Sequence, residues 1–280
     1  MASLRIASLN TGLADWAIDL STWEVRAQKV ANLVVDLRID LLLLQEVWRI
    51  NWAEADDPLR KYLTSLGITG DHNKDDILSA ALGASFSMNS SLIPSSDQGR
   101  KQSGLYWGLG LASRYPIKHI EHQALSYTKF DRWPRIVQHA QIELPGGKNA
   151  ATINVHLPAE SQEARLRTGL ETLAYSRSRN MPITCLGGDM NAFPQSGTPQ
   201  IFLSEYSDCW SSANNRAVRY EADDAHAGSS LFRTVDEGRI DYIFAQRTAK
   251  VANSTYLYGD YGSAPLSDHP FVVVDIDIGP

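Results

Sequence analysis

Several side chains in this sequence are of the types that move protons or bind hard metal ions. Asp189 and Asn191, in the segment Gly188-Asp-Met-Asn191, are two residues apart, so in an extended chain they point to the same side. The carboxylate can orient and deprotonate a water molecule, and the amide can donate to a developing phosphorane oxygen without adding negative charge. Taken alone, however, Asp-x-Asn favours a turn in which both side chains bond their own backbone.

A second group of chemically useful residues stands near the C-terminus. Ser267-Asp268-His269 supplies an adjacent carboxylate and imidazole, which suit a metal ligand and a general acid or base. An ordinary turn also explains this group when it is considered alone. That explanation weakens because further polar residues stand at the ends of apolar segments elsewhere in the chain: Asn10, Glu46, His156 and Asp241.

The apolar pattern predicts the elements that would position these residues. Leu41 to Leu44 is a continuous apolar run, typical of a strand covered on both faces, and it ends on Gln45-Glu46. Further strands are expected over 4–9, 151–155, 183–186, 240–244 and 274–278. A helix is expected over 22–37, where Ser21 and Glu24 have the form of a capping box. The candidate side chains therefore lie at predicted strand ends.

Two stretches are expected to be irregular. Residues 75–104 are rich in serine, which predicts a long loop with a short helix around Ile77 to Ala84. A second long loop is expected at about 214–230. Long loops are usually functional or disordered, and we expect both at the rim of the site. Because no charged or proline-rich linker divides the chain, residues 1–280 are expected to form a single domain.

Composition and charge restrict the class of protein. The 280 residues are 43% hydrophobic and 21% charged, as in a soluble globular protein, and the net charge of −6 disfavours a non-specific nucleic-acid binder. Cys185 lies in an apolar run, so a free buried thiol is expected rather than a disulfide with Cys209. No stretch is long enough to span a bilayer and no export signal is visible, so a cytoplasmic location is expected.

As a set, these segments resemble the endonuclease/exonuclease/phosphatase (deoxyribonuclease I-like) superfamily, which includes abasic-site endonucleases, neutral sphingomyelinases and inositol polyphosphate 5-phosphatases. The sequence around Glu46 and Gly108 is most similar to the sphingomyelinase-related and uncharacterised bacterial branches. The matching segments follow the family's order over essentially the whole chain: Ile6-Ala-Ser-Leu-Asn10, Leu44-Gln-Glu46-Val-Trp48, Gly108-Leu-Gly-Leu-Ala-Ser-Arg-Tyr-Pro-Ile117, Asn154-Val-His156-Leu157, Gly187-Gly-Asp189-Met-Asn191, Arg239-Ile-Asp241-Tyr-Ile243 and Ser267-Asp-His269.

The resemblance implies an α/β (α+β) fold: a four-layer αββα sandwich of two packed, mostly antiparallel sheets flanked by helices. It implies a Mg²⁺ site held by Glu46 with Asn10 and Asp268 in support, in which Mn²⁺ can substitute. Oxygen ligands of this kind suit these ions better than zinc. The catalytic residues would be His156, Asp189, Asn191, Asp241 and His269. In that scheme Asp189 holds the attacking water, Asn191 binds a phosphate oxygen, and His156 contacts the phosphate or the leaving group. Asp241 orients His269, the second acid/base group.

The substrate side of the site is less well defined by the sequence. Tyr106 and Trp107 precede the Gly108 segment, and Lys129, Arg132 and Arg135 form a basic cluster that can contact a phosphate. We expect Tyr106, Trp107 and Arg135 to bind substrate. Tryptophans 16, 48, 107 and 133 fall near predicted strand ends or site loops, where they would either form a stacking pocket or pack the ends of the sandwich.

Three functions are compatible with this set of residues. The first is a Mg²⁺-dependent phosphodiesterase or phosphatase that acts on a small molecule or a lipid headgroup, which the acidic charge favours over nucleic acid. The second is an endonuclease that cleaves DNA or RNA. The third is a binding protein that keeps the fold without catalysis, which the full set of expected site residues disfavours.

Overall fold

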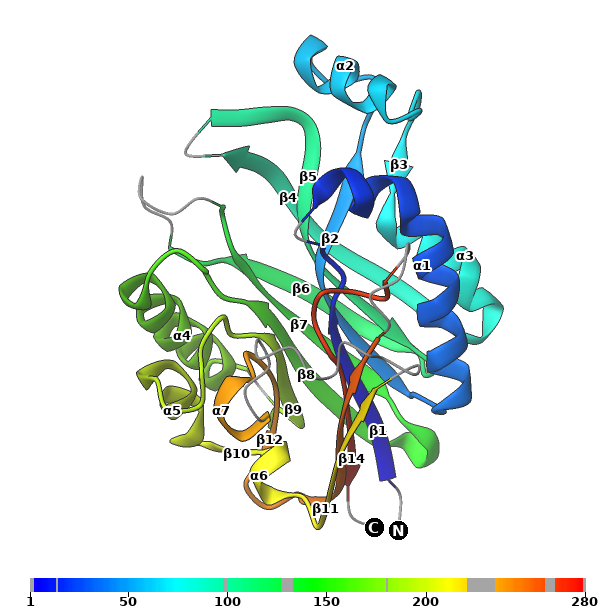
Figure 1. The fold of residues 1–280 in the computed structure, drawn as a ribbon. Coiled ribbons are helices and arrows are strands. Elements are labelled where there is room, and N and C mark those ends of the chain that lie inside the picture. Colours follow the sequence, from blue (N-terminus) through cyan, green and yellow to red (C-terminus); the bar gives the residue numbers. More distant parts are fainter. Residues whose placement is uncertain are drawn as a thin grey trace.

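The computed structural model describes residues 3–13, 15–97, 100–126, 133–179, 181–220, 235–259 and 265–278. Two β-sheets pack face to face, with helices on both outer sides (Figure 1). The described strands and helices thus form the α+β, four-layer sandwich expected from the sequence.

The first sheet has the strand order β11-β13-β14-β1-β2-β5-β4, with β3 paired to β2. Its strands are β1 (Ser3–Asn10), β2 (Leu41–Ile50), β3 (His72–Asn73), β4 (Ser87–Asp97), β5 (Arg100–Ser113), β11 (Asn215–Tyr220), β13 (Lys250–Tyr258) and β14 (Phe271–Asp277). The β1–β2 and β11–β13 pairs are parallel and the others are antiparallel.

The second sheet has the order β10-β12-β9-β8-β7-β6. Its strands are β6 (Ile117–Ala124), β7 (Ile136–Glu143), β8 (Asn149–His156), β9 (Cys185–Asp189), β10 (Tyr206–Asp208) and β12 (Asp241–Gln246). Only the β8–β9 pair is parallel among these described pairings. Both sheets are therefore mixed but mostly antiparallel.

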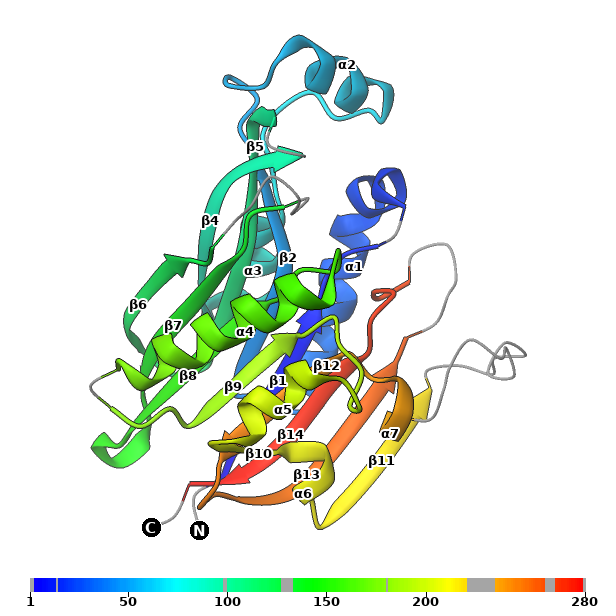
Figure 2. The same ribbon diagram turned by 90° about the vertical axis from the view of Figure 1, so that its left-hand side faces the viewer.

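Helices cover the two outer faces. Figure 1 shows α1 (Trp16–Asp36) and α3 (Lys74–Leu82) outside the first sheet, and α4 (Gln162–Arg177) and α5 (Gly197–Leu203) outside the second. The shorter helices are α2 (Asp57–Ser65), α6 (Cys209–Ser212) and α7 (Val235–Gly238), with 3₁₀ turns at Gly83–Ser85 and Pro145–Gly147. Figures 1 and 2 show α2 at the end of the molecule opposite the two termini.

Side-chain alternation in β1 and β2 explains why these strands lie inside the sandwich. Leu41 and Leu43 belong to the core between the two sheets, whereas Leu42 and Leu44 belong to the core beneath α1 and α3. Because successive residues of a strand face opposite sides, a continuous apolar run fills both layers at once. A third core packs α4 and α5 against the second sheet.

The long loop expected over 75–104 is wrong, although the short helix expected around Ile77 to Ala84 is present as α3. Residues 74–82 form α3, and the serine-rich segment forms β4, which pairs with β5 in an antiparallel hairpin. Serine has a low strand preference, but here its hydroxyls find partners inside the fold: Gln138 Nε2 donates to Ser91 Oγ at 3.0 Å, and Ser90 donates to Asp75. Met88 and Leu92 pack on the α1/α3 core. Tertiary pairing has overridden local preference.

The expected start of the first helix is also wrong, and the second expected loop is only partly described. Asp15 caps α1, since its Oδ1 accepts from Ala17 N at 2.9 Å and Ile18 N at 3.3 Å. Ser21 lies inside the helix, where its hydroxyl donates to Ala17 O at 2.8 Å. Of the expected loop at 214–230, residues 215–220 form β11, and 221–230 lie outside the described residues.

Two further sequence expectations concern cysteines and membranes. Cys185 and Cys209 are both buried and both free, as expected for Cys185. Among the described helices, none combines the length and the apolar character needed to cross a bilayer.

Candidate active site

Strands of the second sheet bring three candidate side chains into one row. His156 ends β8, Asp189 ends β9 and Asp241 begins β12. The register places His156 opposite Asp189 and Asp189 opposite Asp241. Asn10 ends β1 in the first sheet and reaches across, where its Nδ2 donates to Asp189 Oδ2 at 3.0 Å. The predicted strand ends therefore meet at one edge of the sandwich, where both sheets contribute.

The expectation that Glu46 stands at a strand end is wrong, because β2 continues to Ile50 and Glu46 lies at an irregularity inside it. The register with β5 shifts between Leu44 and Val47, and Glu46 has a left-handed backbone, with φ of 56°. Non-glycine residues rarely adopt this conformation, so surrounding contacts must hold it. Thr11 Oγ1 lies 3.0 Å from Gln45 O and 3.1 Å from Glu46 O, and Asn154 Nδ2 donates to Leu44 O at 2.9 Å. The bulge is thus fixed by side chains from neighbouring strands.

The carboxylate of Glu46 lies against Gly12. A Cβ atom at residue 12 would stand 1.9 Å from Glu46 Oε2, so only glycine allows this approach. Asn10 Nδ2 donates to Glu46 Oε1 at 3.2 Å, and Asn10 Oδ1 accepts from Gly12 N at 3.0 Å. Asn10 therefore presents its amide nitrogen to both Glu46 and Asp189.

Asp189 and Asn191 form a turn and are also part of the site. Asn191 N donates to Asp189 Oδ1 at 2.7 Å, which is the backbone bond expected of an Asp-x-Asn turn. Asn191 has φ of 46°, and its Nδ2 lies 2.9 Å from Leu157 O and 3.1 Å from His156 Nε2. His156 Nε2 lies 3.3 Å from Asp189 Oδ2. The turn and the functional arrangement are one structure rather than alternatives.

His269 approaches Asp189 from the other side. Its Nδ1 lies 2.9 Å from Asp241 Oδ2, and its Nε2 lies 3.8 Å from Asp189 Oδ2. Its backbone N donates to Ser267 Oγ at 3.1 Å. Asp268 is more exposed and lies 3.9 Å from His269 Nε2. A carboxylate on Nδ1 fixes the ring orientation and favours the imidazolium form.

Burial and charge separate the proton affinities of the site residues. Burial is the main reason that the pKa of Asp189 rises from 3.8 to about 6, and the charge of Asp241 adds to it. Burial also lowers the pKa of His156 well below 6.5, reinforced by the positive charges of Arg135 and His269. For His269 burial acts in the same direction, but Asp241 and Asp189 outweigh it and hold the pKa well above 6.5. The shifts therefore favour the neutral form of His156 and the protonated form of His269.

The acidic residues of this edge fit a divalent cation. Ligand atoms of Asp189, Asp241 and His269 all lie within 4.8 Å of one another. Burial raises the pKa of Glu46, and the charge of Lys74 only partly opposes this. Within the described part of the chain, the Glu46 carboxylate accepts a hydrogen bond only from Asn10. Carboxylate oxygens gathered in this way are donors of the kind that divalent cations such as Mg²⁺ and Mn²⁺ accept.

Of the three residues expected to bind substrate, the structure places Arg135 and Trp107 beside His156 but not Tyr106. Arg135 and Trp107 line a small recess together with His156. Trp107 stacks on Trp133, with ring centroids 5.9 Å apart and planes at 14°. Tyr106 points elsewhere, because its hydroxyl contacts Glu54. Trp48 is fully buried and so belongs to the core. Lys129, Arg132 and the side chain of Trp16 lie outside the described residues.

Some residues that support the site were not predicted. Gln45 Nε2 donates to Asn154 Oδ1 at 2.8 Å beneath the bulge, and three buried charged residues, Asp19, Arg26 and Lys74, lie behind it. Asp19 and Arg26 are seven residues apart in α1 and therefore share one helix face. Charged residues on a face that is otherwise apolar would have been the available signal in the sequence.

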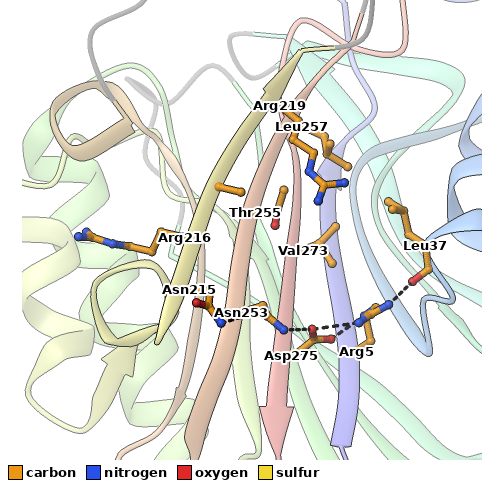
Figure 3. A pocket seen from close by; sticks show the side chains of 11 residues that line it. Arg5, Leu37, Asn215, Arg216, Arg219, Asn253, Thr255, Leu257, Val273 and Asp275 are labelled. Atoms are coloured by element: carbon orange, nitrogen blue, oxygen red, sulfur yellow. Dashed lines mark hydrogen bonds and ion pairs between the residues drawn. The ribbon is translucent and has the colours of Figure 1, made fainter.

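A separate groove of about 370 Å³ lies on the outer face of β11, β13, β14 and β1 (Figure 3). Arg5 crosses it to pair with Asp275, Nε to Oδ1, at 2.5 Å, and Asn253 also donates to Asp275. None of the candidate site residues lines this groove. The groove is therefore distinct from the acidic edge.

Comparisons with known proteins agree with the fold. The model of the "Endonuclease/Exonuclease/phosphatase family" matches residues 7–269. Similar solved structures include an endonuclease/exonuclease/phosphatase from Bacteroides vulgatus (TM-score 0.72, 18% identity, 100% of each chain covered). A second is the mannosyl-6-phosphatase of Bacteroides thetaiotaomicron, with a TM-score of 0.65 and 19% identity over 98% of this chain and 100% of that chain. A third is D. rerio TDP2 complexed with a single-strand DNA product, with a TM-score of 0.59 and 16% identity over 99% of this chain and 100% of that chain. A search of curated proteins gave no match.

Proposed function

Because the chain belongs to the endonuclease/exonuclease/phosphatase family, whose members are generally metal-dependent hydrolases of phosphoesters, we propose that it hydrolyses a phosphoester by attack of water on phosphorus. The observation that carries this proposal is the row of His156, Asp189 and Asp241, closed by His269 on one side and by Asn10 and Glu46 on the other.

Asp189 is the residue proposed to hold the attacking water. It lies at the centre of the row, and its carboxylate is fixed by Asn10 Nδ2 and by Asn191 N. A carboxylate whose pKa is raised to about 6 is a stronger base than an ordinary aspartate, yet it remains largely ionised at neutral pH. This combination suits the removal of a proton from water as the bond to phosphorus forms.

The two histidines would serve different steps. Neutral His156, with the Asn191 amide 3.1 Å from its Nε2, would contact the phosphate oxygens without adding charge. Protonated His269 would donate its proton to the leaving oxygen, and Asp241 would hold its ring in place through the 2.9 Å contact to Nδ1. The proposed division therefore follows the opposite pKa shifts of the two rings.

Glu46 would be the principal ligand of a Mg²⁺ ion, with Asn10 and Asp268 in support. Asp241 is a weaker candidate because its Oδ2 is already used by His269 Nδ1. The bound cation would neutralise negative charge on the phosphate and on the leaving oxygen. Mn²⁺ would substitute, because it accepts the same oxygen ligands.

We propose a small molecule or a lipid headgroup as substrate. The net charge of −6 repels a polyanion, and the recess beside His156 offers Arg135 for a phosphate and Trp107 for a flat or apolar group. The family also contains proteins that act on nucleic acid, and one similar structure holds a single-strand DNA product. Cleavage of DNA or RNA is therefore the competing activity.

A substrate panel tests this proposal. The purified chain would be assayed with Mg²⁺, Mn²⁺ or EDTA against p-nitrophenyl phosphate, bis-p-nitrophenyl phosphate, mannose 6-phosphate, inositol phosphates and sphingomyelin. We expect metal-dependent release of product from at least one of them. An Asp189→Asn variant, purified in the same way, controls for contaminating phosphatases. Equal rates in both preparations would contradict the proposal, and metal binding without turnover of any phosphoester would support a non-catalytic binding protein.

A further inference from the structure

A buried group of charged side chains lies behind the acidic edge, between α1 and the start of α3. Asp19, Arg26 and Lys74 have side-chain exposures of 1%, 0% and 1%. Asp19 joins the two cations: its Oδ1 accepts from Arg26 Nη1, and its Oδ2 accepts from Lys74 Nζ at 2.9 Å. Trp48 Nε1 also donates to Asp19 Oδ2, at 3.2 Å. With one anion and two cations, the group is positively charged.

The remaining donors of the two cations reach main-chain carbonyls outside the helices. Lys74 Nζ donates to Thr11 O at 2.9 Å, and Arg26 Nη2 donates to the same oxygen at 2.6 Å. Arg26 also donates to Pro265 O at 2.9 Å through Nε and to Leu266 O at 3.1 Å through Nη2. These carbonyls belong to the segments that directly follow Asn10 and directly precede Asp268 and His269.

Thr11 extends the same connections to Glu46. Its Oγ1 accepts from Lys74 Nζ at 3.3 Å and shares its own proton between Gln45 O and Glu46 O. Glu46 is the residue with the left-handed backbone, so these carbonyl contacts help to hold a conformation that is unfavourable by itself. Ser267 Oγ completes the arrangement by donating to Asn10 O at 2.5 Å.

Stability alone gives a poor account of this group. A buried ion group loses much of its attraction to the cost of desolvation, and well-packed apolar residues of similar volume often stabilise a fold equally well. A packing role between α1 and α3 would require contacts between those helices only. The hydrogen bonds instead gather three segments that come from distant parts of the sequence and carry Asn10, Glu46 and Asp268.

We infer that Asp19, Arg26 and Lys74 are positioning residues that set the affinity of the site for its divalent cation, by fixing the main chain beside Asn10, Glu46 and Asp268. This inference rests on the proposed function, because it takes those residues as the metal ligands. As positioning residues they act through the carbonyls of Thr11, Pro265 and Leu266 and through the Thr11 hydroxyl, which in turn contacts Glu46 O.

Direct binding of Mn²⁺ to the full, metal-stripped chain, followed by electron paramagnetic resonance, tests this inference. Lys74→Met removes the ammonium but keeps a side chain of similar length, and Thr11→Val removes only the hydroxyl. We expect each to weaken Mn²⁺ binding by about 10-fold or more, as losses of residues that orient metal ligands usually do. Thr11→Ser keeps the hydroxyl and should bind Mn²⁺ as the wild type does. If Lys74→Met does not fold, Arg26→Lys carries the test, because it keeps the charge but loses the fork of donors to Thr11, Pro265 and Leu266.

Phe202→Leu provides the control for general loss of stability, because Phe202 is buried in the core beneath α5, away from the acidic edge. It should lower the thermal midpoint while leaving Mn²⁺ affinity unchanged. Wild-type affinity in both Thr11→Val and Lys74→Met, or an equal loss in Phe202→Leu, would overturn the inference. Failure of the wild type itself to bind Mn²⁺ would overturn the proposed function as well, so the two failures are distinguishable.

Discussion

Asp189 is subject to opposing demands. It must be ionised to hold and deprotonate a water molecule, yet it is only 1% exposed and lies opposite Asp241 in the sheet. Burial raises its pKa to about 6, and hydrogen bonds from Asn10 and from Asn191 N offset part of this. Its ionised form is therefore functional but unfavourable for folding.

Replacing Asp189 by Asn should separate these two effects. We expect turnover to fall by about 10²- to 10⁴-fold because the proposed base is lost.

Since the folded-state pKa lies above the ordinary value of 3.8, the stability contributed by Asp189 is fully present below pH 3.8 and is lost as the pH rises through about 6. The metal-free variant should thus be at least as stable as the wild type at pH 7. Activity assays and urea unfolding in EDTA measure both quantities. Near-normal turnover or a marked loss of stability would contradict the assignment.

The two histidines should titrate on opposite sides of pH 6.5 in the metal-free protein. NMR of the imidazole rings should place the pKa of His156 below this value and that of His269 above it. Asp241→Asn should lower the pKa of His269, because it removes the partner of Nδ1. A single shared pKa, or no response to Asp241→Asn, would refute the proposed division of roles.

The contact between Asp241 and His269 also affects the pH dependence of stability. A histidine whose pKa is raised in the folded state stabilises the fold fully below pH 6.5 and loses that contribution as the pH rises through its folded-state value. The destabilisation caused by Asp241→Asn should therefore shrink in alkaline solution, as measured by urea unfolding at several pH values.

At the scale of elements, the sequence predicted where β1, β8 and β9 end, but it ended β2 at Gln45-Glu46, where the strand instead bulges and continues to Ile50. Apolar runs mark the ends of β1, β8 and β9 because those strands are covered on both faces, so Asn10, His156 and Asp189 could be placed in advance. The bulge at Glu46 could not, because its left-handed backbone depends on Thr11 and Asn154 from other strands. No local pattern records such distant contacts.

Two further elements differ from what their local residue preferences predict. The serines of β4 favour a loop by themselves, but pairing with β5 and the contact from Gln138 to Ser91 make them a strand. Ser21 matches a capping box, but Asp15, more than one and a half turns earlier, caps α1. The strand thus depended on contacts that exist only in the fold, whereas the cap is a local contact from Asp15 to the backbone two and three residues later.

The close approach of Gly12 to the bulge gives a sharp test at this scale. In Gly12→Ala the new Cβ would meet Glu46 Oε2 and Cδ, at 1.9 and 2.6 Å, and both atoms belong to the end of a movable side chain. We expect the fold to survive and Glu46 to be displaced, so that Mn²⁺ affinity falls by about 10-fold or more.

Gly70→Ala is the matched control, because nothing lies within 4 Å of a Cβ atom at that position. It should change neither the thermal midpoint nor Mn²⁺ binding. If Gly12→Ala retained wild-type Mn²⁺ affinity, Glu46 could not be the principal ligand in the position that the structure gives it.

At the scale of the whole molecule, the negative net charge favours a small substrate over nucleic acid. With a net charge of −6, the chain lacks the overall positive field that draws proteins to a polyphosphate backbone. The small recess beside His156 is instead lined by one cationic side chain, Arg135, and by Trp107. The net charge could be read from the sequence, whereas the stacking of Trp107 on Trp133 could be seen only in the folded structure.

Supercoiled plasmid at low salt tests this preference. We expect little or no nicking at enzyme concentrations that turn over small phosphoesters, since association with DNA depends on neutralising its phosphates with cationic side chains. Efficient nicking at low enzyme concentration, reduced by added salt, would instead identify the chain as a nuclease while leaving the proposed chemistry intact.

The central claim is that Glu46 holds a cation on which hydrolysis depends. The most direct measurement is the rate of bis-p-nitrophenyl phosphate hydrolysis as a function of Mg²⁺ concentration, for the wild type and for Glu46→Gln. We predict a wild-type rate that saturates with Mg²⁺ and vanishes in EDTA, and a variant that needs far more Mg²⁺ or shows no activity. A wild-type rate that is indifferent to Mg²⁺ and EDTA, or a variant with the same Mg²⁺ dependence as the wild type, would contradict the claim.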